Sequence, residues 1–449
     1  MDRPPSGEGN QAIDWFIIYP GILLIPALMF IEVRVIGRLF LSEMILAGLL
    51  PFLLLYRGRA LFGFLPQSFL ALAFFWLVSQ VATDLYIGTP FSDLARGWAK
   101  IINTMINFMA IYLLTYGSRR RIDIFAFGVT IGYFLIYLFN PGEQMEEDPW
   151  KFGLGLAVTL LFCNIASIKQ IYRTGLLPIL CMLVPAALSL AQASRSLAGI
   201  SFLATVYVFF QFYIGGRQAK ARLTPMKTVM LVAAAIGGVL VLLEVYGFVA
   251  SQGLLGREAQ YKYEMQSQGE FGILLGGRAE IFVSIQAISD SPIVGHGSWA
   301  KDPRYAAMLL KLENYGYEIS SLSMESGLIP SHSHLFGAWV EAGILGAIFW
   351  LWVIFLIMGV MVKLSIVRES LSPLVAFAGL LLLWDVLFSP FGAERRILIP
   401  FYLVILMAAS KFVDEHWAQQ ETRERVRAGV ESGELVKGWW GKFVKKGKT

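Results

Sequence analysis

Residues 330–362 read PSHSHLFGAWVEAGILGAIFWLWVIFLIMGVMV, an apolar run that opens on two histidines and holds one carboxylate, Glu341. An α-helix needs about 20 apolar residues to cross a hydrocarbon core of roughly 30 Å. The run from 335 to 362 exceeds that length, so we predict that it spans a membrane. His332 and His334 then lie at its mouth, where a polar segment that begins near Gly247 ends.

The rest of the 449-residue chain has the same apolar character. Hydrophobic residues make up 56% of it, charged residues make up 15%, and the mean hydropathy is +0.62. Soluble domains carry about 25% charged residues, so one soluble core cannot bury this much apolar surface. We predict an all-α polytopic membrane protein with about twelve transmembrane helices, because continuous apolar runs differ from the short alternating strands of outer-membrane barrels. The predicted spans are 13–31, 38–56, 65–83, 98–117, 122–139, 152–171, 175–193, 196–215, 227–247, 335–362, 371–389 and 395–412.

Charged residues in the connections orient the predicted bundle. Every second connection is basic, and the intervening ones are mixed or acidic, as in PGEQMEEDPW at 141–150. By the positive-inside rule the basic set is cytoplasmic, so both termini are expected in the cytoplasm and the polar segment outside. The basic set comprises Arg57, Arg59, Arg119, Arg120, Arg121, Lys169, Arg173, Arg217, Lys220, Arg222, Lys227, Lys363 and Arg368.

These assignments divide the chain into four parts. Membrane helices one to nine occupy 1–246, an outward-facing loop with amphipathic helices occupies 247–334, and helices ten to twelve occupy 335–412. The remaining 413–449 form a basic tail that is either an interfacial anchor on anionic lipid or a disordered segment. We interpret the first span as a retained helix, not a signal peptide.

Cysteine content and net charge say little about function. Cys163 and Cys181 lie inside apolar spans, and the chain has no Cys/His spacing typical of a metal site. We therefore expect no structural metal and no disulfide framework. We also expect no cofactor. The net charge of +5 reflects the tail and the inner loops, so we infer no nucleic-acid partner.

Arg195 is the first candidate functional residue. It stands in SLAQASRSLAGIS, a short link between two apolar spans. A cation at that depth is costly unless it meets an anion or water, so it is either a functional group or an arginine that reaches the outer headgroups.

Arg278 is the second candidate. Gly276 and Gly277 precede it, and Phe282, Ile285 and Ile288 follow at helical spacing, which places it near the start of an amphipathic helix. A helix N-terminus and a guanidinium together suit a phosphate or diphosphate. The alternative is an ion pair with Glu280 or another loop acid.

The histidines at the end of the polar segment supply the third candidate. Imidazole can move a proton near neutral pH or hydrogen-bond a sugar hydroxyl. Two histidines two residues apart point in different directions, so only one of His332 and His334 is expected to face a given site. Glu341 and Gly343 follow at the start of the next span and favour a tightly packed helix that fixes the histidine.

Taken together, these motifs resemble the O-antigen ligase and O-antigen polymerase superfamily. The resemblance covers about 190–350 and rests on HSHLFGAWVEAGILG, GGRAEIF, SPIVGHG and the Ser194–Arg195 pair. Members carry a histidine followed nine residues later by glutamate and eleven later by glycine, a spacing that favours His332 over His334. Many members have asparagine after the histidine, where this chain has Ser333.

The resemblance implies a metal-independent, inverting glycosyltransferase of the multi-spanning GT-C-like type in the bacterial inner membrane. Its periplasmic loop would take a glycan from undecaprenyl diphosphate and pass it to a hydroxyl of lipid A core. A polymerase that extends a lipid-linked glycan would use the same residues, and a polytopic transporter is the rival from another class. Arg195 and Arg278 are expected to bind the diphosphate, and His332 to engage the acceptor.

Other polar residues are secondary candidates for the site. Glu341 and His334 are candidates for substrate contact, as are Arg395 and Arg396, which could extend the cationic patch. A structural ion pair between Asp385 and one of these arginines is the favoured alternative, because it would relieve the cost of a carboxylate in lipid. Four aromatic residues of the polar segment could stack on sugar faces or could cover the membrane-facing loop: Tyr261, Tyr263, Trp299 and Tyr305.

Overall fold

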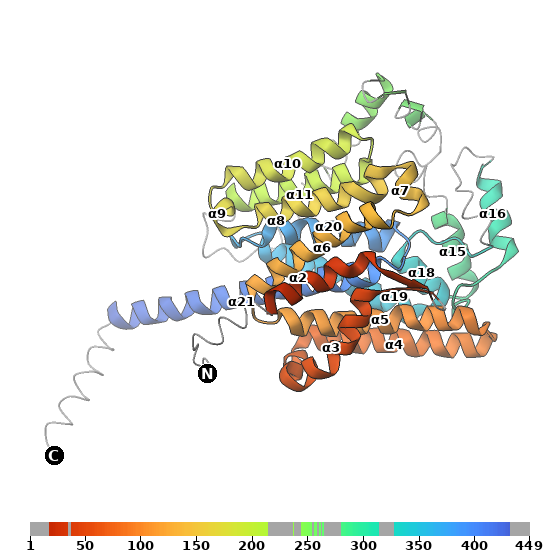
Figure 1. Ribbon diagram of the computed structural model, residues 1–449, viewed down its shortest axis with the longest axis horizontal. Helices are drawn as coiled ribbons and strands as arrows, with labels where there is room; N and C mark the ends of the chain where they lie inside the picture. The colour runs from red at the N-terminus through yellow and green to blue at the C-terminus, as the bar shows by residue number, and fades with distance from the viewer. Residues whose placement is uncertain are drawn as a thin grey trace, which may run out of the picture.

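The computed structural model describes residues 18–34, 37–213, 237, 244–253, 256–257, 260–261, 263–264, 280–313 and 327–431. Its helices run along one long direction and form a bundle (Figure 1). Helices α15 (Glu280–Asp290) and α16 (Pro303–Glu313) lie beside one end of it, and α21 (Arg395–Glu431) extends beyond the other end. The first part of the predicted basic tail is thus helical, as the continuation of α21 to Glu431.

Seven of the described helices are long and apolar enough to cross a membrane. They are α3 with the following 3-10 turn (Leu41–Phe62), α4 (Phe64–Ile87), α5 (Phe91–Thr115), α6 (Arg119–Phe139), α11 (Arg195–Tyr213), α19 (Ile344–Leu364) and the first part of α21 (Arg395–Arg423). Four shorter apolar helical segments coincide with four further predicted spans: α2 with a 3-10 turn (Tyr19–Phe30), a π-helical turn with α8 (Trp150–Ala166), α10 (Leu176–Ala191) and α20 (Ser372–Phe388). Most of the predicted span 227–247 lies outside the described residues, so the count of twelve stays a prediction.

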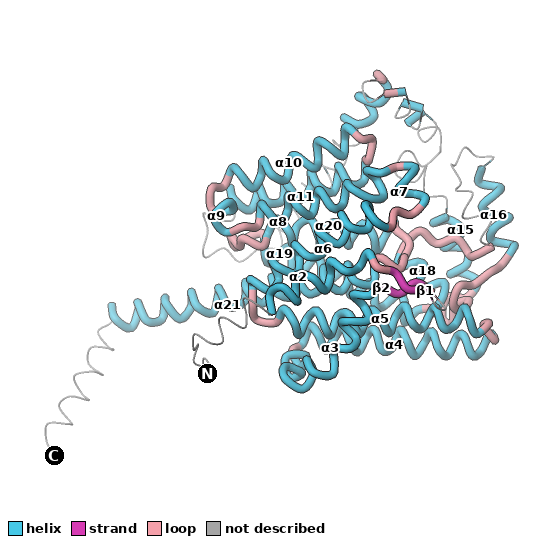
Figure 2. The backbone as a smooth tube through the Cα atoms, in the orientation of Figure 1, coloured by secondary structure: helices cyan, strands magenta, loops and turns pink. Residues whose placement is uncertain are grey.

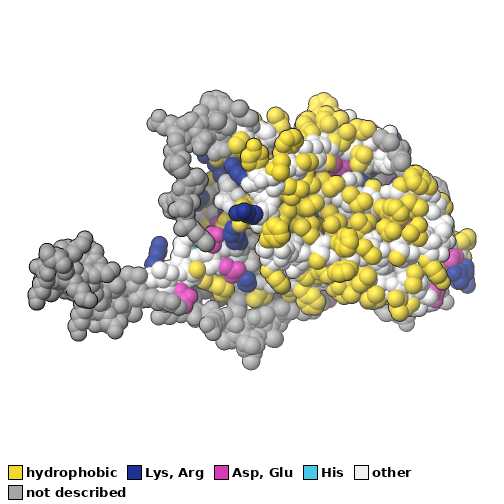
Figure 3. Space-filling view, turned by 90° about the horizontal axis from the view of Figure 1, so that it is seen from below, with side chains coloured by type: hydrophobic (Ala, Val, Ile, Leu, Met, Phe, Trp, Pro, Cys, Tyr) yellow, Lys and Arg dark blue, Asp and Glu magenta, His cyan; other side chains and the backbone are white. Residues whose placement is uncertain are grey.

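The bundle exposes apolar side chains along its flank. Figure 3 shows a face covered by them, with charged side chains gathered toward its ends. Phe64 and Leu55, for example, are 81% and 83% exposed. Burial from water is worth about 25 cal/mol per Å² of apolar surface. Such a face is therefore costly in water and suited to lipid.

The interior is built around α20 and the first half of α21. Phe377, Leu382, Phe401 and Leu403 on these two helices are fully buried. Helices that are apolar all round belong in the centre of a bundle, because they have no polar face to offer to solvent. Figure 2 shows the surrounding helices and the connections at the bundle ends.

The predicted span 335–362 is not one helix, and this expectation was wrong in that respect. It divides into α18 (His334–Ala342) and α19, which begins at Ile344. Gly343 between them has φ 67° and ψ −157°, a conformation that essentially only glycine adopts. Hydropathy does not report backbone conformation, so an apolar run hides such a break.

A second difference lies between the first two predicted spans. Strands β1 (Glu32–Arg34) and β2 (Arg38–Phe40) form an antiparallel ribbon in which Val33 faces Leu39. Residues 38–40 are thus strand, and helix α3 starts only at Leu41. The Glu32 carboxylate accepts from Arg34 of the same strand at 2.8 Å and from Arg38 of β2 at 3.0 Å, and a hydropathy window detects neither contact.

Candidate functional site

His332 lies beside a buried carboxylate. Its Nδ1 atom is 3.4 Å from Oε1 of Glu280, which is in the first turn of α15. The histidine side chain is 32% exposed and that of Glu280 only 7%. A buried acid that faces one ring nitrogen of a half-exposed imidazole can fix the orientation and tautomer of that ring.

Packing fixes the elements that carry these two groups. Val283 and Ala287 of α15 are fully buried in a small apolar cluster with Ile329 and Val340. The Ser284 hydroxyl lies 2.8 Å from the carbonyl oxygen of Pro330, which joins α15 to the segment before His332. The position of the pair therefore depends on ordinary core packing.

His334 occupies a different environment. It is 1% exposed, its Nδ1 is 2.7 Å from the carbonyl oxygen of Ser389, and its ring contacts those of Trp350 and Phe391. Burial and the positive charge of Arg395 hold the pKa of His334 well below its usual range. His334 is thus a neutral, enclosed side chain at the start of α18.

Glu341 and the helix break lie on the inner side of α18. The Glu341 carboxylate pairs with Lys100 of α5. Both side chains are mostly buried, at 18% and 15% exposure. Glu341 is therefore already engaged with an internal cation and helps to connect α18 to the bundle.

Residues 291–298 are held between α4 and α18. The Thr83 hydroxyl donates to the carbonyl oxygen of Val294 at 2.5 Å, and the amide of His296 donates to that of Val340 at 2.6 Å. The SPIVGHG motif within this segment thus fixes the position of α18 and the break that follows it.

Asp84, near the end of α4, is the centre of this attachment. Its carboxylate is fully buried and accepts from the amide and hydroxyl of Ser298 at 2.6 and 2.7 Å. It also accepts from the Thr89 hydroxyl at 2.9 Å and the Trp98 indole at 2.8 Å. Four donors around one carboxylate offset its removal from water.

Replacing Asp84 with asparagine is expected to lower the free energy of unfolding by roughly 2 to 4 kcal/mol. An amide keeps the shape but has one acceptor oxygen, so an N–H of Ser298 or Trp98 must face an NH₂ group. Thermal unfolding of the purified protein in detergent measures the loss. Asp414→Asn is the matched control, because its carboxylate is 54% exposed and pairs with Lys363, an arrangement worth at most about 1 kcal/mol. Equal stability of the two variants would contradict this account of Asp84.

Arg195, expected in the link between two spans, is the first residue of α11, directly after the short link from α10. Its guanidinium lies over the ring of Tyr246, 5.1 Å from the centroid. Ala193 in the link has φ 53°, a left-handed conformation uncommon for a residue with a side chain. The link lies toward the same end of the bundle as α15 and α18 (Figure 1). Arg278 and Gly277 lie outside the described residues.

The two arginines of GAERRIL are already bound to internal acids. Arg395 pairs with Asp385, so the structural ion pair expected for that carboxylate is confirmed. Arg396 holds Glu43 through two contacts of 2.8 Å. Both guanidiniums connect α21 to the rest of the bundle, and in this arrangement each is paired with a carboxylate of the protein itself.

The remaining polar-segment residues divide between structural and exposed positions. Nε2 of His296 is 2.7 Å from the carbonyl oxygen of Ala287, and the Tyr305 hydroxyl donates to Asp290 at 2.6 Å. Tyr305 is 3% exposed and therefore unsuited to stacking on a sugar, whereas Trp299 is 39% exposed.

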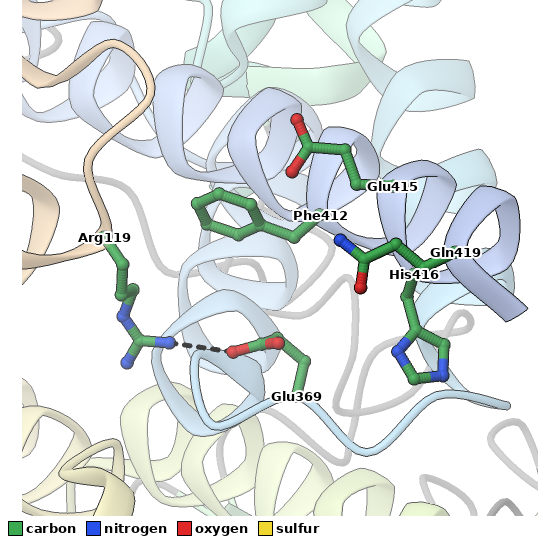
Figure 4. Close-up of a pocket in the computed structure, with 6 residues that line it drawn as sticks. All are labelled: Arg119, Glu369, Phe412, Glu415, His416 and Gln419. Atoms are coloured by element: carbon green, nitrogen blue, oxygen red, sulfur yellow. Dashed lines mark hydrogen bonds and ion pairs between the residues drawn. The ribbon is translucent and has the colours of Figure 1, made fainter. Parts of the chain in front are cut away.

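A cavity of about 210 Å³ lies at the opposite end of the bundle. Figure 4 shows Arg119 facing Glu369 across it, with 3.0 Å between the guanidinium and the carboxylate. It contains none of the predicted site residues. Its lining consists of Arg119, Glu369, Phe412, Glu415, His416 and Gln419.

Sequence reasoning missed three of the groups that shape the site. The sequence analysis predicts Glu280 only as a partner of Arg278 and selects neither Asp84 nor Lys100. A charge within or at the end of an apolar span needs a partner, and this rule selects Asp84 and Lys100. Within the described residues, no group of three or more His, Cys, Asp or Glu side chains is arranged to hold a metal ion.

The fold and the lipid-suited flank define a polytopic helical membrane protein, with seven membrane-length apolar helices among the described residues. No protein-family model matches the chain, and no curated protein matches it either.

Proposed function

We propose that the protein is a glycosyltransferase that moves a glycan from undecaprenyl diphosphate to an acceptor hydroxyl on the periplasmic face of the inner membrane. The acceptor in this proposal is lipid A core, as in an O-antigen ligase. The observation that carries the proposal is the half-exposed imidazole of His332 beside the buried carboxylate of Glu280. The likeness of the surrounding motifs to the ligase and polymerase superfamily supplies the substrate class.

The chemistry requires a base and a site for developing negative charge. The acceptor oxygen attacks the anomeric carbon, its proton passes to Nε2 of His332, and the bond between that carbon and the diphosphate oxygen breaks. The undecaprenyl diphosphate that leaves carries the additional charge. Arg195, and Arg278 outside the described residues, would stabilise that charge without a metal ion.

Two observations favour His332 over His334 as the base. His332 is half-exposed, whereas His334 is enclosed by Trp350 and Phe391. A general base must come within hydrogen-bond reach of the substrate proton, and an enclosed ring cannot do so without rearrangement. Arg395 and Glu341 then support the site from within the protein.

Reconstitution tests this function and separates it from the alternatives. Proteoliposomes that contain the protein receive undecaprenyl-diphosphate-linked repeat units, with or without lipid A core, and the products are resolved on a gel. We expect a shift that appears only with lipid A core. A ladder without core would instead identify a polymerase, and no product together with solute uptake would overturn the transferase proposal in favour of a transporter.

A further inference from the structure

The buried carboxyl group of Glu280 lies beside the imidazole of His332. Glu280 is 5% exposed, and burial of a carboxylate costs several kcal/mol unless it is paired or hydrogen-bonded. Its position in the first turn of α15 is favourable for a negative charge. The first turn of α15 therefore presents the Glu280 carboxyl group to Nδ1 of His332.

We infer that Glu280 is the positioning residue of His332, which holds its Nδ1–H so that Nε2 faces the acceptor hydroxyl. This inference rests on the proposed transferase function and assigns a role within it. A carboxylate that accepts from one ring nitrogen selects the tautomer in which the other nitrogen carries the lone pair that takes up a proton. It also stabilises the imidazolium that forms when the proton arrives.

The separation of 3.4 Å is slightly longer than a hydrogen bond. Catalytic pairs are often long before substrate is bound and shorten in the reactive complex. The elements around them are held firmly, because Ser284 bonds the carbonyl oxygen of Pro330 and Val283 is fully buried. A small rotation of either side chain is sufficient to close the gap.

The other acids and the second histidine near this point have partners of their own. On α15, Asp290 accepts a hydrogen bond from the Tyr305 hydroxyl. On α18, the mostly buried Glu341 forms an ion pair with Lys100. His334 is bonded to the carbonyl oxygen of Ser389. Among the described acids of α15 and α18, Glu280 is therefore the one placed to act on His332.

Glu280→Gln is the test, because glutamine keeps the size and removes the charge. We expect the transfer rate at saturating substrate to fall by roughly 10- to 1,000-fold while KM changes little, since the amide can favour the wrong tautomer. The acid limb of the pH–rate profile should move to lower pH, because a carboxylate favours the protonated imidazole and its loss lowers the histidine pKa. Asp290→Asn, which removes another acid from the same helix, should leave both unchanged.

A measurement that does not need substrate separates this inference from the proposed function. The chain has only four histidines, so labelled imidazole signals can be assigned by substitution and titrated by NMR in the full-length protein. We expect a lower His332 pKa in Glu280→Gln than in the wild-type protein. If the wild-type protein transfers no glycan and this difference is present, the transferase proposal fails and the pairing stands.

An unchanged His332 pKa in Glu280→Gln would overturn the inference, even if the rate falls, because Glu280 would then act only through the fold. Should Glu280→Gln fail to fold, Glu280→Asp provides the second variant. Aspartate retains the charge but holds it one methylene farther from His332. We therefore expect a transfer rate and a His332 pKa below the wild-type values. Wild-type values for both in that variant would equally overturn the inference.

Discussion

Replacing Gly343 with alanine is expected to lower the free energy of unfolding by about 4 kcal/mol or more. The backbone at this position, φ 67° and ψ −157°, lies in a region that residues with a Cβ almost never occupy. A Cβ would also overlap the carbonyl oxygen of Ile293, which belongs to the segment that α4 holds in place. Relief of the overlap requires α18 to separate from residues 291–298.

Gly359 supplies the control for this substitution. It lies inside α19, and a Cβ added there meets nothing within 4 Å. Alanine at that position should raise stability by at most about 1 kcal/mol, because glycine is the poorer helix former. Thermal unfolding of both variants in detergent, followed by size exclusion, measures the contrast. A Gly343→Ala protein as stable as Gly359→Ala would show that the break is not a structural requirement.

The apolar runs predicted the helices well because membrane insertion depends mainly on length and hydropathy. They failed where backbone geometry decides the outcome. Gly343 interrupts a continuous apolar sequence, and residues 38–40 form a strand although they belong to an apolar run. The break at Gly343 depends on close approach to Ile293, which is distant in the sequence, whereas the strand depends on pairing with Glu32–Arg34 a few residues before it.

The candidate site was predicted in part, and for physical reasons. Motif spacing selected His332, and the cost of a charge in lipid predicted the Asp385–Arg395 pair. The partner of His332 could not be selected from sequence, because Glu280 is 52 residues away and reaches the histidine only through packing of α15. The role of Arg278 remains a prediction of the sequence alone.

Substitution of His332 with alanine is expected to reduce glycan transfer by about 100- to 10,000-fold, the usual contribution of a general base. The fold should be little affected, since the side chain is 32% exposed and stands before α18 begins. Initial rates with lipid-linked donor and lipid A core in proteoliposomes give the measurement. His416→Ala is the matched control, because His416 is an exposed histidine of α21 that lines the cavity in Figure 4, which contains none of the predicted site residues.

The comparison with His334→Ala makes this prediction specific to one of the two neighbouring histidines. His334 is buried against Trp350 and bonded to Ser389, so its truncation leaves a cavity and should lower stability by roughly 2 to 4 kcal/mol. His332→Ala is expected to show the opposite pattern, because removal of a half-exposed general base lowers the transfer rate and changes the free energy of unfolding little. If His332→Ala transferred glycan at the wild-type rate while His334→Ala, compared at equal amounts of folded protein, did not, the buried histidine would be the working residue. The site would then have to open around α18 for the acceptor to reach it.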